Sequence, residues 1–149
     1  MTYYFLESSA LAKLFVMEDG SEPLIRLMEQ TEDARKLVSS LASLEVRSAI
    51  RRRQRAGEIP AGDADLALDH LAAECLRMVE QPISPAVIEM TRYVLDQHPL
   101  RALDALHLAT CLVARDTLQA TDIYFVSSDE PLLDAAETEN FQILDPLEM

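Results

Sequence analysis

Four acidic residues stand at positions where an α/β chain of this length can gather them into one pocket. Glu7 follows an apolar N-terminal run, and Asp129 follows a short β-rich run. Glu45 and Asp104 interrupt apolar stretches that have helical spacing. Carboxylates in mainly apolar surroundings are costly unless something offsets their charge. A divalent metal ion is the simplest offset, so these four residues are predicted to form a metal site.

The ligand set of this predicted site suits a hard cation. Mg²⁺ and Mn²⁺ prefer oxygen ligands, and Mg²⁺ keeps several waters beside a few carboxylates. Such an ion polarises a phosphoryl oxygen and lowers the pKa of bound water, which favours phosphodiester hydrolysis. The histidines have neither the H-x-x-x-H spacing nor the cysteine neighbours of a zinc site.

Other enzyme templates do not match. The chain has no G-x-S-x-G, G-x-x-x-x-G-K-[ST] or G-x-G-x-x-G motif. A phospho-receiver domain would need an acidic pair after the first strand and a lysine late in the chain. Here Glu7 stands alone, and both lysines, Lys13 and Lys36, lie in the first quarter.

Strands and helices are predicted to alternate along the chain. Apolar and β-branched runs predict strands over residues 2–6, 36–39, 123–126 and 141–144, with a few strand residues around Ile83. Helical spacing and cap signals predict helices over residues 10–16, 22–30, 41–56, 60–80, 85–97, 103–115 and 129–138. Ser8 or Ser9 is expected to cap the first helix, and Gly57 to end the third.

This alternation predicts one α/β domain with a parallel sheet covered on both faces. Ligands of such sheets bind outside the carboxyl ends of the strands. Glu7 and Asp129 each stand just past a strand end. Glu45 and Asp104 join them if their helices begin at the same edge.

Charge is unevenly distributed along the chain. The net charge of −13 argues against nucleic-acid binding by bulk charge. However, five arginines fall between residues 47 and 55. Such a run is commonly a solvated helix face, and beside an acidic pocket it could hold a phosphate backbone. Arg47 and Arg51 are the candidate contacts to RNA or to a partner.

The remaining composition predicts a cytoplasmic protein. Cys75 and Cys111 lie far apart without C-x-x-C spacing, which favours buried thiols in a reducing compartment. No apolar run approaches the roughly 20 residues of a membrane span, so no membrane association is expected. Glu7 and Lys13 interrupt the N-terminal apolar stretch, so no signal peptide is expected.

Four segments resemble PIN-domain ribonucleases, most closely the VapC toxins of bacterial toxin–antitoxin pairs. They are residues 3–13 (YYFLESSALAK), 43–49 (SLEVRSA), 103–109 (LDALHLA) and 126–136 (VSSDEPLLDAA). The resemblance covers essentially the whole chain and implies a PIN-like three-layer α/β fold over residues 1–149, with a central, mostly parallel sheet flanked by helices. It also implies a Mg²⁺- or Mn²⁺-dependent endoribonuclease that is usually a homodimer and is kept inactive by a cognate antitoxin.

Carried over by position, Glu45, Asp104 and Asp129 match metal-site acids of the family. Glu7 matches the first acid, where the family normally has aspartate. The extra methylene moves the carboxylate by roughly 1–1.5 Å on the scale of ordinary bond lengths. A misplacement of about 1 Å in a preorganised site can lower the rate about 100-fold.

Several neighbouring residues are assigned supporting roles. Ser9 resembles a hydroxyl residue near the family site, although it serves equally well as a helix cap. Ser127 resembles the hydroxyl residue two before the last acid, which it would orient. His107 follows Asp104 by three residues on the same helix face and is predicted to be a packed or hydrogen-bonded structural residue.

Two functions remain open at this point. The first is a metal-dependent endoribonuclease that acts as the toxin of a toxin–antitoxin pair and cleaves RNA. The second is a catalytically weakened or inactive PIN-like module that binds a protein partner. Glu7 and the strongly negative charge motivate the second function, in which an arginine of the partner would replace the metal.

Overall fold

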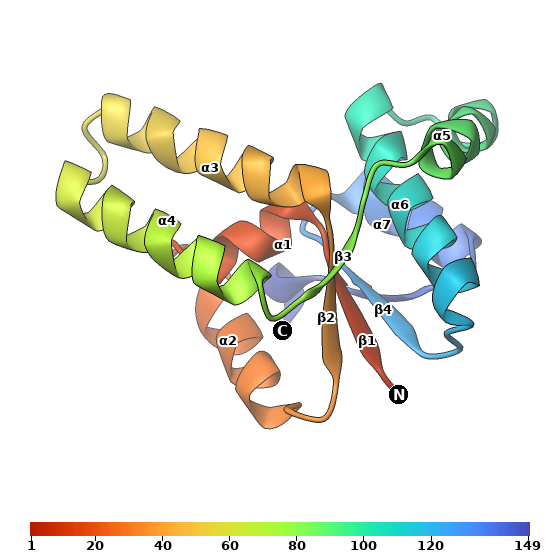
Figure 1. The fold of residues 1–149 in the computed structure, drawn as a ribbon, viewed down its shortest axis with the longest axis horizontal. Helices are drawn as coiled ribbons and strands as arrows, with labels where there is room; N and C mark the ends of the chain where they lie inside the picture. Colours follow the sequence, from red (N-terminus) through yellow and green to blue (C-terminus); the bar gives the residue numbers. More distant parts are fainter.

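Five short strands form the central sheet of the computed structural model, which describes residues 1–149 (Figure 1). The strands are β1 (Tyr3–Leu6), β2 (Arg35–Ser39), β3 (Val79–Gln81), β4 (Ile123–Val126) and β5 (Gln142–Leu144). Their order across the sheet is β3-β2-β1-β4-β5, and every neighbouring pair is parallel. The predicted parallel sheet is therefore confirmed.

Helices cover both faces of this sheet and complete the three layers (Figure 1). They are α1 (Ser8–Lys13), α2 (Ser21–Gln30), α3 (Ser40–Arg55), α4 (Ala61–Cys75), α5 (Pro85–Gln97), α6 (Ala102–Leu118) and α7 (Glu130–Thr138), followed by the short 3₁₀ helix η1 (Pro146–Glu148). One hydrophobic core contains buried residues of α1 to α4, and the other contains buried residues of α5 to α7. None of the helices is both long enough and apolar enough to cross a membrane.

Alternation along the strands divides the side chains between these two cores. Phe5 lies in the core beneath α5 to α7, with its ring centroid 5.2 Å from that of Phe125 on the adjacent strand. Tyr4 lies on the opposite face, 5.1 Å from Tyr124. Successive residues of a strand point to opposite faces, so the apolar runs in β1 and β4 supply both cores.

The strand register brings three loops to one edge of the sheet. Leu6 at the end of β1 is paired with Val126 at the end of β4, and the Glu7 amide donates to the Val126 carbonyl at 3.1 Å. On the other side of β1, strand β2 ends at Ser39, whose hydroxyl accepts from the Leu41 amide at 3.1 Å and caps α3. This edge is where parallel sheets form their ligand sites.

The predicted helix over residues 60–80 is wrong in its last five residues. Helix α4 ends at Cys75, and Val79–Gln81 instead forms β3, which pairs with Leu37–Ser39 of β2. The predicted strand residues around Ile83 are also wrong, because the strand ends before Pro82. The outer edge of β2 presents unpaired peptide groups, and pairing them in the sheet outweighs continuing the helix.

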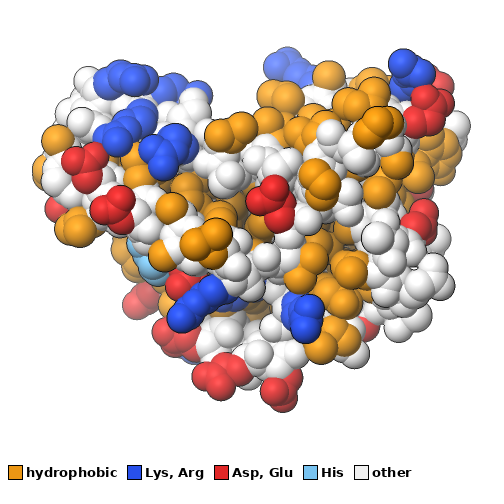
Figure 2. Space-filling view, in the orientation of Figure 1, with side chains coloured by type: hydrophobic (Ala, Val, Ile, Leu, Met, Phe, Trp, Pro, Cys, Tyr) orange, Lys and Arg blue, Asp and Glu red, His pale blue; other side chains and the backbone are white.

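Two pairs of helices flank the carboxyl edge of the sheet. Helices α3 and α4 form a hairpin that projects from the sheet as an arm, and α5 and α6 pack together on the other side (Figure 1). The molecular surface is notched between this arm and the α5–α6 pair (Figure 2). Gly57 has a left-handed φ of 78° in the connection after α3, as the predicted helix end requires.

Candidate active site

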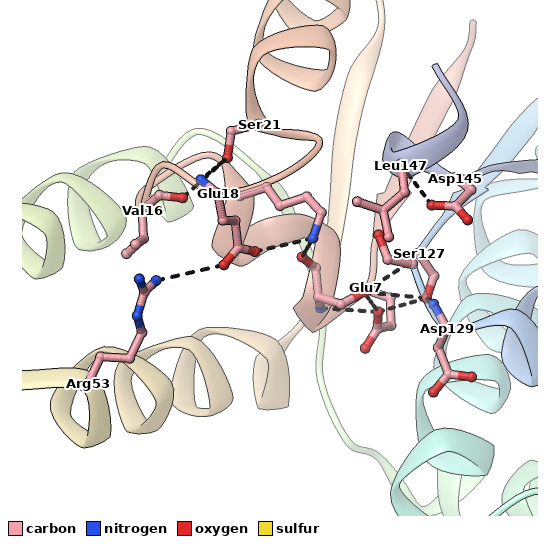
Figure 3. Close-up of polar contacts among 12 residues, drawn as sticks. Glu7, Val16, Glu18, Ser21, Arg53, Ser127, Asp129, Asp145 and Leu147 are labelled. Carbon is pink, nitrogen blue, oxygen red and sulfur yellow. Dashed lines mark hydrogen bonds and ion pairs between the residues drawn. The ribbon is translucent and has the colours of Figure 1, made fainter. Parts of the chain in front are cut away.

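Glu7 lies at the centre of a cluster of hydroxyl groups at the carboxyl edge. Its side chain is only 7% exposed, and one carboxylate oxygen, Oε2, accepts from the Ser9 amide at 3.1 Å and the Ser9 hydroxyl at 2.5 Å. The Ser127 hydroxyl donates to the same oxygen at 2.9 Å (Figure 3). Glu7 is also the N-cap of α1, so the expectation that Ser8 or Ser9 caps this helix is wrong.

The same hydroxyl groups also bind the segment that follows β4. The Ser127 hydroxyl accepts from the Asp129 amide at 3.1 Å, and the Ser9 hydroxyl accepts from the Ser128 amide at 3.0 Å. Asp129 accepts from the Leu132 amide at 3.1 Å and caps α7. The backbone positions of Glu7 and Asp129 are therefore fixed relative to each other by short hydrogen bonds (Figure 3).

Glu45 forms a second polar cluster with Ser8 and His107, neither of which was predicted to be a site residue. Its Oε1 atom contacts Nε2 of His107 and accepts from the Ser8 hydroxyl at 2.8 Å. The His107 side chain is only 1% exposed, and its Nδ1 atom has no hydrogen-bond partner. His107 is thus a buried, hydrogen-bonded residue, in agreement with its predicted structural role.

Charge and hydrogen bonding shift the pKa of both members of this pair. Burial alone would raise the pKa of Glu45, but the hydrogen bonds from His107 and Ser8 and the charge of His107 outweigh it and lower that pKa. Burial alone would lower the pKa of His107, but its hydrogen bond to Glu45 and the charge of Glu45 outweigh it, and the His107 pKa is raised. Both shifts favour the ion pair.

The pKa of Asp104 is shifted in the opposite direction to that of Glu45. It lies in the first turn of α6, and its pKa is raised by burial first and by the charge of Asp129 second. Glu45 raises the pKa further, while His107 and Arg101 lower it. A raised pKa means that the carboxylate form of Asp104 is under-compensated by its surroundings.

The nearby buried cation does not neutralise this edge. Lys13 is 6% exposed, but its ammonium group lies 3.1 Å from Glu18 and also donates to the Ser9 carbonyl at 3.4 Å (Figure 3). Arg53 also approaches Glu18, at 3.7 Å. Both cations are therefore paired with Glu18, and neither forms an ion pair with the four acidic residues.

The donor set of this edge fits a divalent cation on chemical grounds. Four carboxylates, with hydroxyl groups around them, are the ligands that hard cations prefer, and the pKa of Asp104 is raised by burial and then by the nearby charges of Asp129 and Glu45. No three histidine, cysteine, aspartate or glutamate side chains converge into a complete metal-binding group in this structure. The four-residue metal site therefore stays a prediction.

The two arginines singled out from the sequence have different surroundings. Arg51 donates to Asp65 of α4 at 2.9 Å and to Gln54 at 2.7 Å, so it ties the two helices of the arm together. Arg47 is exposed and forms no ion pair. Neither arginine contacts the four acidic residues.

Ser8 and His107 could not be assigned from the sequence because their roles depend on distant partners. Glu45 is separated from Ser8 by 37 residues and from His107 by 62. The available signal was the spacing of Asp104 and His107, which places both on one face of α6. That spacing indicates a shared direction but not the partner.

Comparison with known proteins identifies the family. The sequence matches the PIN domain over residues 4–137, and the chain belongs to that family. It is 32% identical over 143 residues to Ribonuclease VapC35 of Mycobacterium tuberculosis, covering 95% of this chain and 96% of that relative. The resemblance to PIN-domain proteins of the VapC type is thereby confirmed.

Solved structures share the fold at low sequence identity. PAE2754 from Pyrobaculum aerophilum is similar with a TM-score of 0.66 and 17% identity, covering 99% of this chain and 90% of that chain. VapBC2 from Rickettsia felis, in a crystal structure bound to a DNA fragment from its promoter, has a TM-score of 0.65 and 12% identity, covering 97% of this chain and 98% of that chain. These likenesses support the PIN-like three-layer arrangement.

Proposed function

We propose that this protein is a Mg²⁺- or Mn²⁺-dependent endoribonuclease and the toxin component of a toxin–antitoxin pair. The observation that carries the proposal is the position of the acidic residues at the carboxyl edge of the sheet, where the Ser127 hydroxyl joins Glu7 to the Asp129 amide and the charges of Asp129 and Glu45 both act on Asp104. The relative called Ribonuclease VapC35, which matches nearly the whole chain, supports the activity. A cognate antitoxin, a homodimeric state and a cytoplasmic location belong to the same proposal.

Glu7, Glu45, Asp104 and Asp129 would hold the cation. When bound, the cation supplies positive charge that polarises a phosphoryl oxygen and lowers the pKa of water. The other residues keep these acids in position: Ser9 and Ser127 fix one oxygen of Glu7, and Ser8 and His107 fix one oxygen of Glu45. In each case the second carboxylate oxygen has no hydrogen bond from the protein and is available as a ligand.

Cleavage of a mixed RNA pool by purified, partner-free protein tests this proposal. Cutting is expected in Mg²⁺ or Mn²⁺ and is expected to disappear in chelator, because four carboxylates alone cannot stabilise the charge that develops on a phosphoryl group. The products are resolved on a denaturing gel. Undiminished cutting in chelator would contradict the metal-dependent activity. Such cutting belongs to this chain if it follows the protein across column fractions, and to a contaminant if it does not.

The glutamate at position 7 motivates the second candidate, a weakened partner-binding module. Glu7→Asp separates the two functions because the Glu7 carboxylate already has three donors at hydrogen-bond distance. Shortening the side chain by one methylene withdraws the carboxylate by about 1.5 Å from Ser9 and Ser127. An active nuclease adapted to glutamate is expected to lose roughly 10- to 100-fold in kcat/KM.

The opposite result would favour the second candidate. If glutamate at position 7 weakens catalysis, Glu7→Asp raises the cleavage rate above that of the wild type. Ser128→Ala serves as a matched control near Glu7, because the Ser128 hydroxyl is buried but has no hydrogen-bond partner. Its cleavage rate is expected to stay within about twofold of the wild type.

A further inference from the structure

The five arginines of α3 fall into two groups according to their partners. Arg51 is paired with Asp65 at 2.9 Å, and Arg53 is paired with Glu58 at 3.1 Å and with Glu18 at 3.7 Å. Both side chains are about one-third exposed. Their charges are neutralised, and their guanidinium groups fasten α3 to neighbouring segments.

The other three arginines carry uncompensated charge. Arg47, Arg52 and Arg55 are exposed, and none of them forms an ion pair with a carboxylate. The one side-chain contact of Arg52 is to the Ser48 hydroxyl at 3.4 Å. Basic side chains gather on the outer surface of the α3–α4 arm (Figure 2). In a chain with a net charge of −13, this is a local surface of the opposite sign.

Two of these arginines are aligned with the acidic site. Arg52 follows Glu45 by seven residues, which is close to two helical turns, and so lies on the same side of α3 about 10 Å farther along the axis. Arg55 follows Glu45 by ten residues, about 2.8 turns and about 15 Å, so it is displaced by nearly a quarter turn from Glu45 and by less than that from Arg52. Arg47 is only two residues from Glu45 and lies on a different side of the helix. Arg52 and Arg55 therefore form a row that leads away from Glu45 along the arm.

We propose that the Arg52–Arg55 row binds the phosphate backbone of a single-stranded RNA whose next phosphodiester lies at the acidic site. The inference rests on the proposed function, because it takes RNA as the substrate of that site. Guanidinium groups bind phosphate through two parallel hydrogen bonds, and exposed, unpaired arginines are free to do so. An acidic protein segment carries charge of the same sign as RNA but lacks the phosphate oxygens that the planar guanidinium group matches, so poly-glutamate is the competing ligand.

Binding of a fluorescently labelled single-stranded RNA tests the inference in chelator, where cleavage does not interfere. The variant Arg52→Gln/Arg55→Gln is compared with Arg51→Gln/Arg53→Gln, which removes the same charge from the same helix. Loss of two phosphate contacts is expected to raise the Kd roughly 10-fold at moderate salt. It should also reduce the slope of log Kd against log salt by about 1.4, at about 0.7 for each single-strand contact. The control pair is expected to keep the wild-type slope.

Three results would overturn the inference: an unchanged Kd and slope in Arg52→Gln/Arg55→Gln, an equal loss in the control pair, or tighter binding of poly-glutamate than of RNA. Poly-glutamate preference would assign the row to an acidic protein segment. Circular dichroism verifies that both double variants are folded. Wild-type protein that binds RNA through this row yet never cleaves it would refute the proposed nuclease activity but would confirm that the row binds RNA.

Discussion

Asp104→Asn is expected to lower kcat/KM for RNA on the order of 1000-fold while the chain remains folded. Asparagine keeps the size and shape of the side chain but removes the negative charge that a divalent cation needs. Losing one preorganised charge in an active site commonly costs a factor of 100 to 1000, as for other groups that stabilise developing charge. Single-turnover cleavage with excess enzyme measures this loss without interference from product release.

Asp134→Asn is the matched control for this substitution. Asp134 is an exposed acid on α7, five residues beyond Asp129, and it has no place in the proposed site. Its cleavage rate is expected to equal that of the wild type within error. Equal activity in Asp104→Asn and the wild type would remove Asp104 from the site and with it the proposed role of the acidic edge.

Stability provides a second signature of Asp104 that does not depend on activity. Its folded-state pKa is raised by burial and then by the charge of Asp129, so its ionisation destabilises the fold as pH rises above its ordinary value of about 3.8. Asparagine does not ionise. The Tm of Asp104→Asn relative to wild type, measured in chelator, is therefore expected to rise between pH 4 and pH 7. A fall over this range would contradict the assigned electrostatics.

Most of the sheet could be predicted because its strands carry strong local signals. The apolar run of β1 ends at Glu7, and that of β4 ends at Ser127, so both strands and the residues that leave them were recognisable. Strand β3 was not, because Val79 continues the helical spacing of α4 and only three residues pair with β2. Its strand conformation is decided by the exposed edge of β2, which is a tertiary effect.

The candidate site, like the sheet, could be predicted from the sequence only where the signals are local. Glu7 and Asp129 followed from the general rule that parallel sheets place ligands at their carboxyl ends. The additional claim that Glu45 and Asp104 lie nearby required the family resemblance, since it depends on where two helices begin. Beside local bonds such as those from Ser9 to Glu7, these acids are held by hydrogen bonds between residues 37 to 120 positions apart, and local periodicity carries no information about such distant pairs.

Replacement of His107 is expected to produce the largest loss of stability among the site variants. The side chain is 1% exposed, lies within α6 and contacts Glu45. His107→Ala leaves a cavity and deprives Glu45 of one of its two hydrogen-bond partners, which together lower the free energy of unfolding by about 3 kcal/mol. Chemical denaturation in chelator near pH 5.5 measures this change.

The pH dependence of the loss identifies the ion pair as its cause. The folded-state pKa of His107 is raised, so its contribution is fully present below about pH 6.5 and is lost as pH rises through the raised value. The folded-state pKa of Glu45 is lowered, so its contribution is present above about pH 4.5 and is lost as pH falls through the lowered value. The pair therefore stabilises the fold most between these two pH values.

His107→Gln isolates this charge effect, because glutamine can still donate a hydrogen bond to Glu45 but cannot become a cation. The difference in unfolding free energy between wild type and His107→Gln is expected to peak between about pH 4.5 and 6.5 and to shrink on both sides. His70→Gln is the control, since His70 is 58% exposed and lies 3.9 Å from Glu74. Its difference should stay near zero at every pH. A flat profile for His107→Gln would mean that His107 and Glu45 meet as a neutral pair, and that their charges add nothing to the stability of the fold.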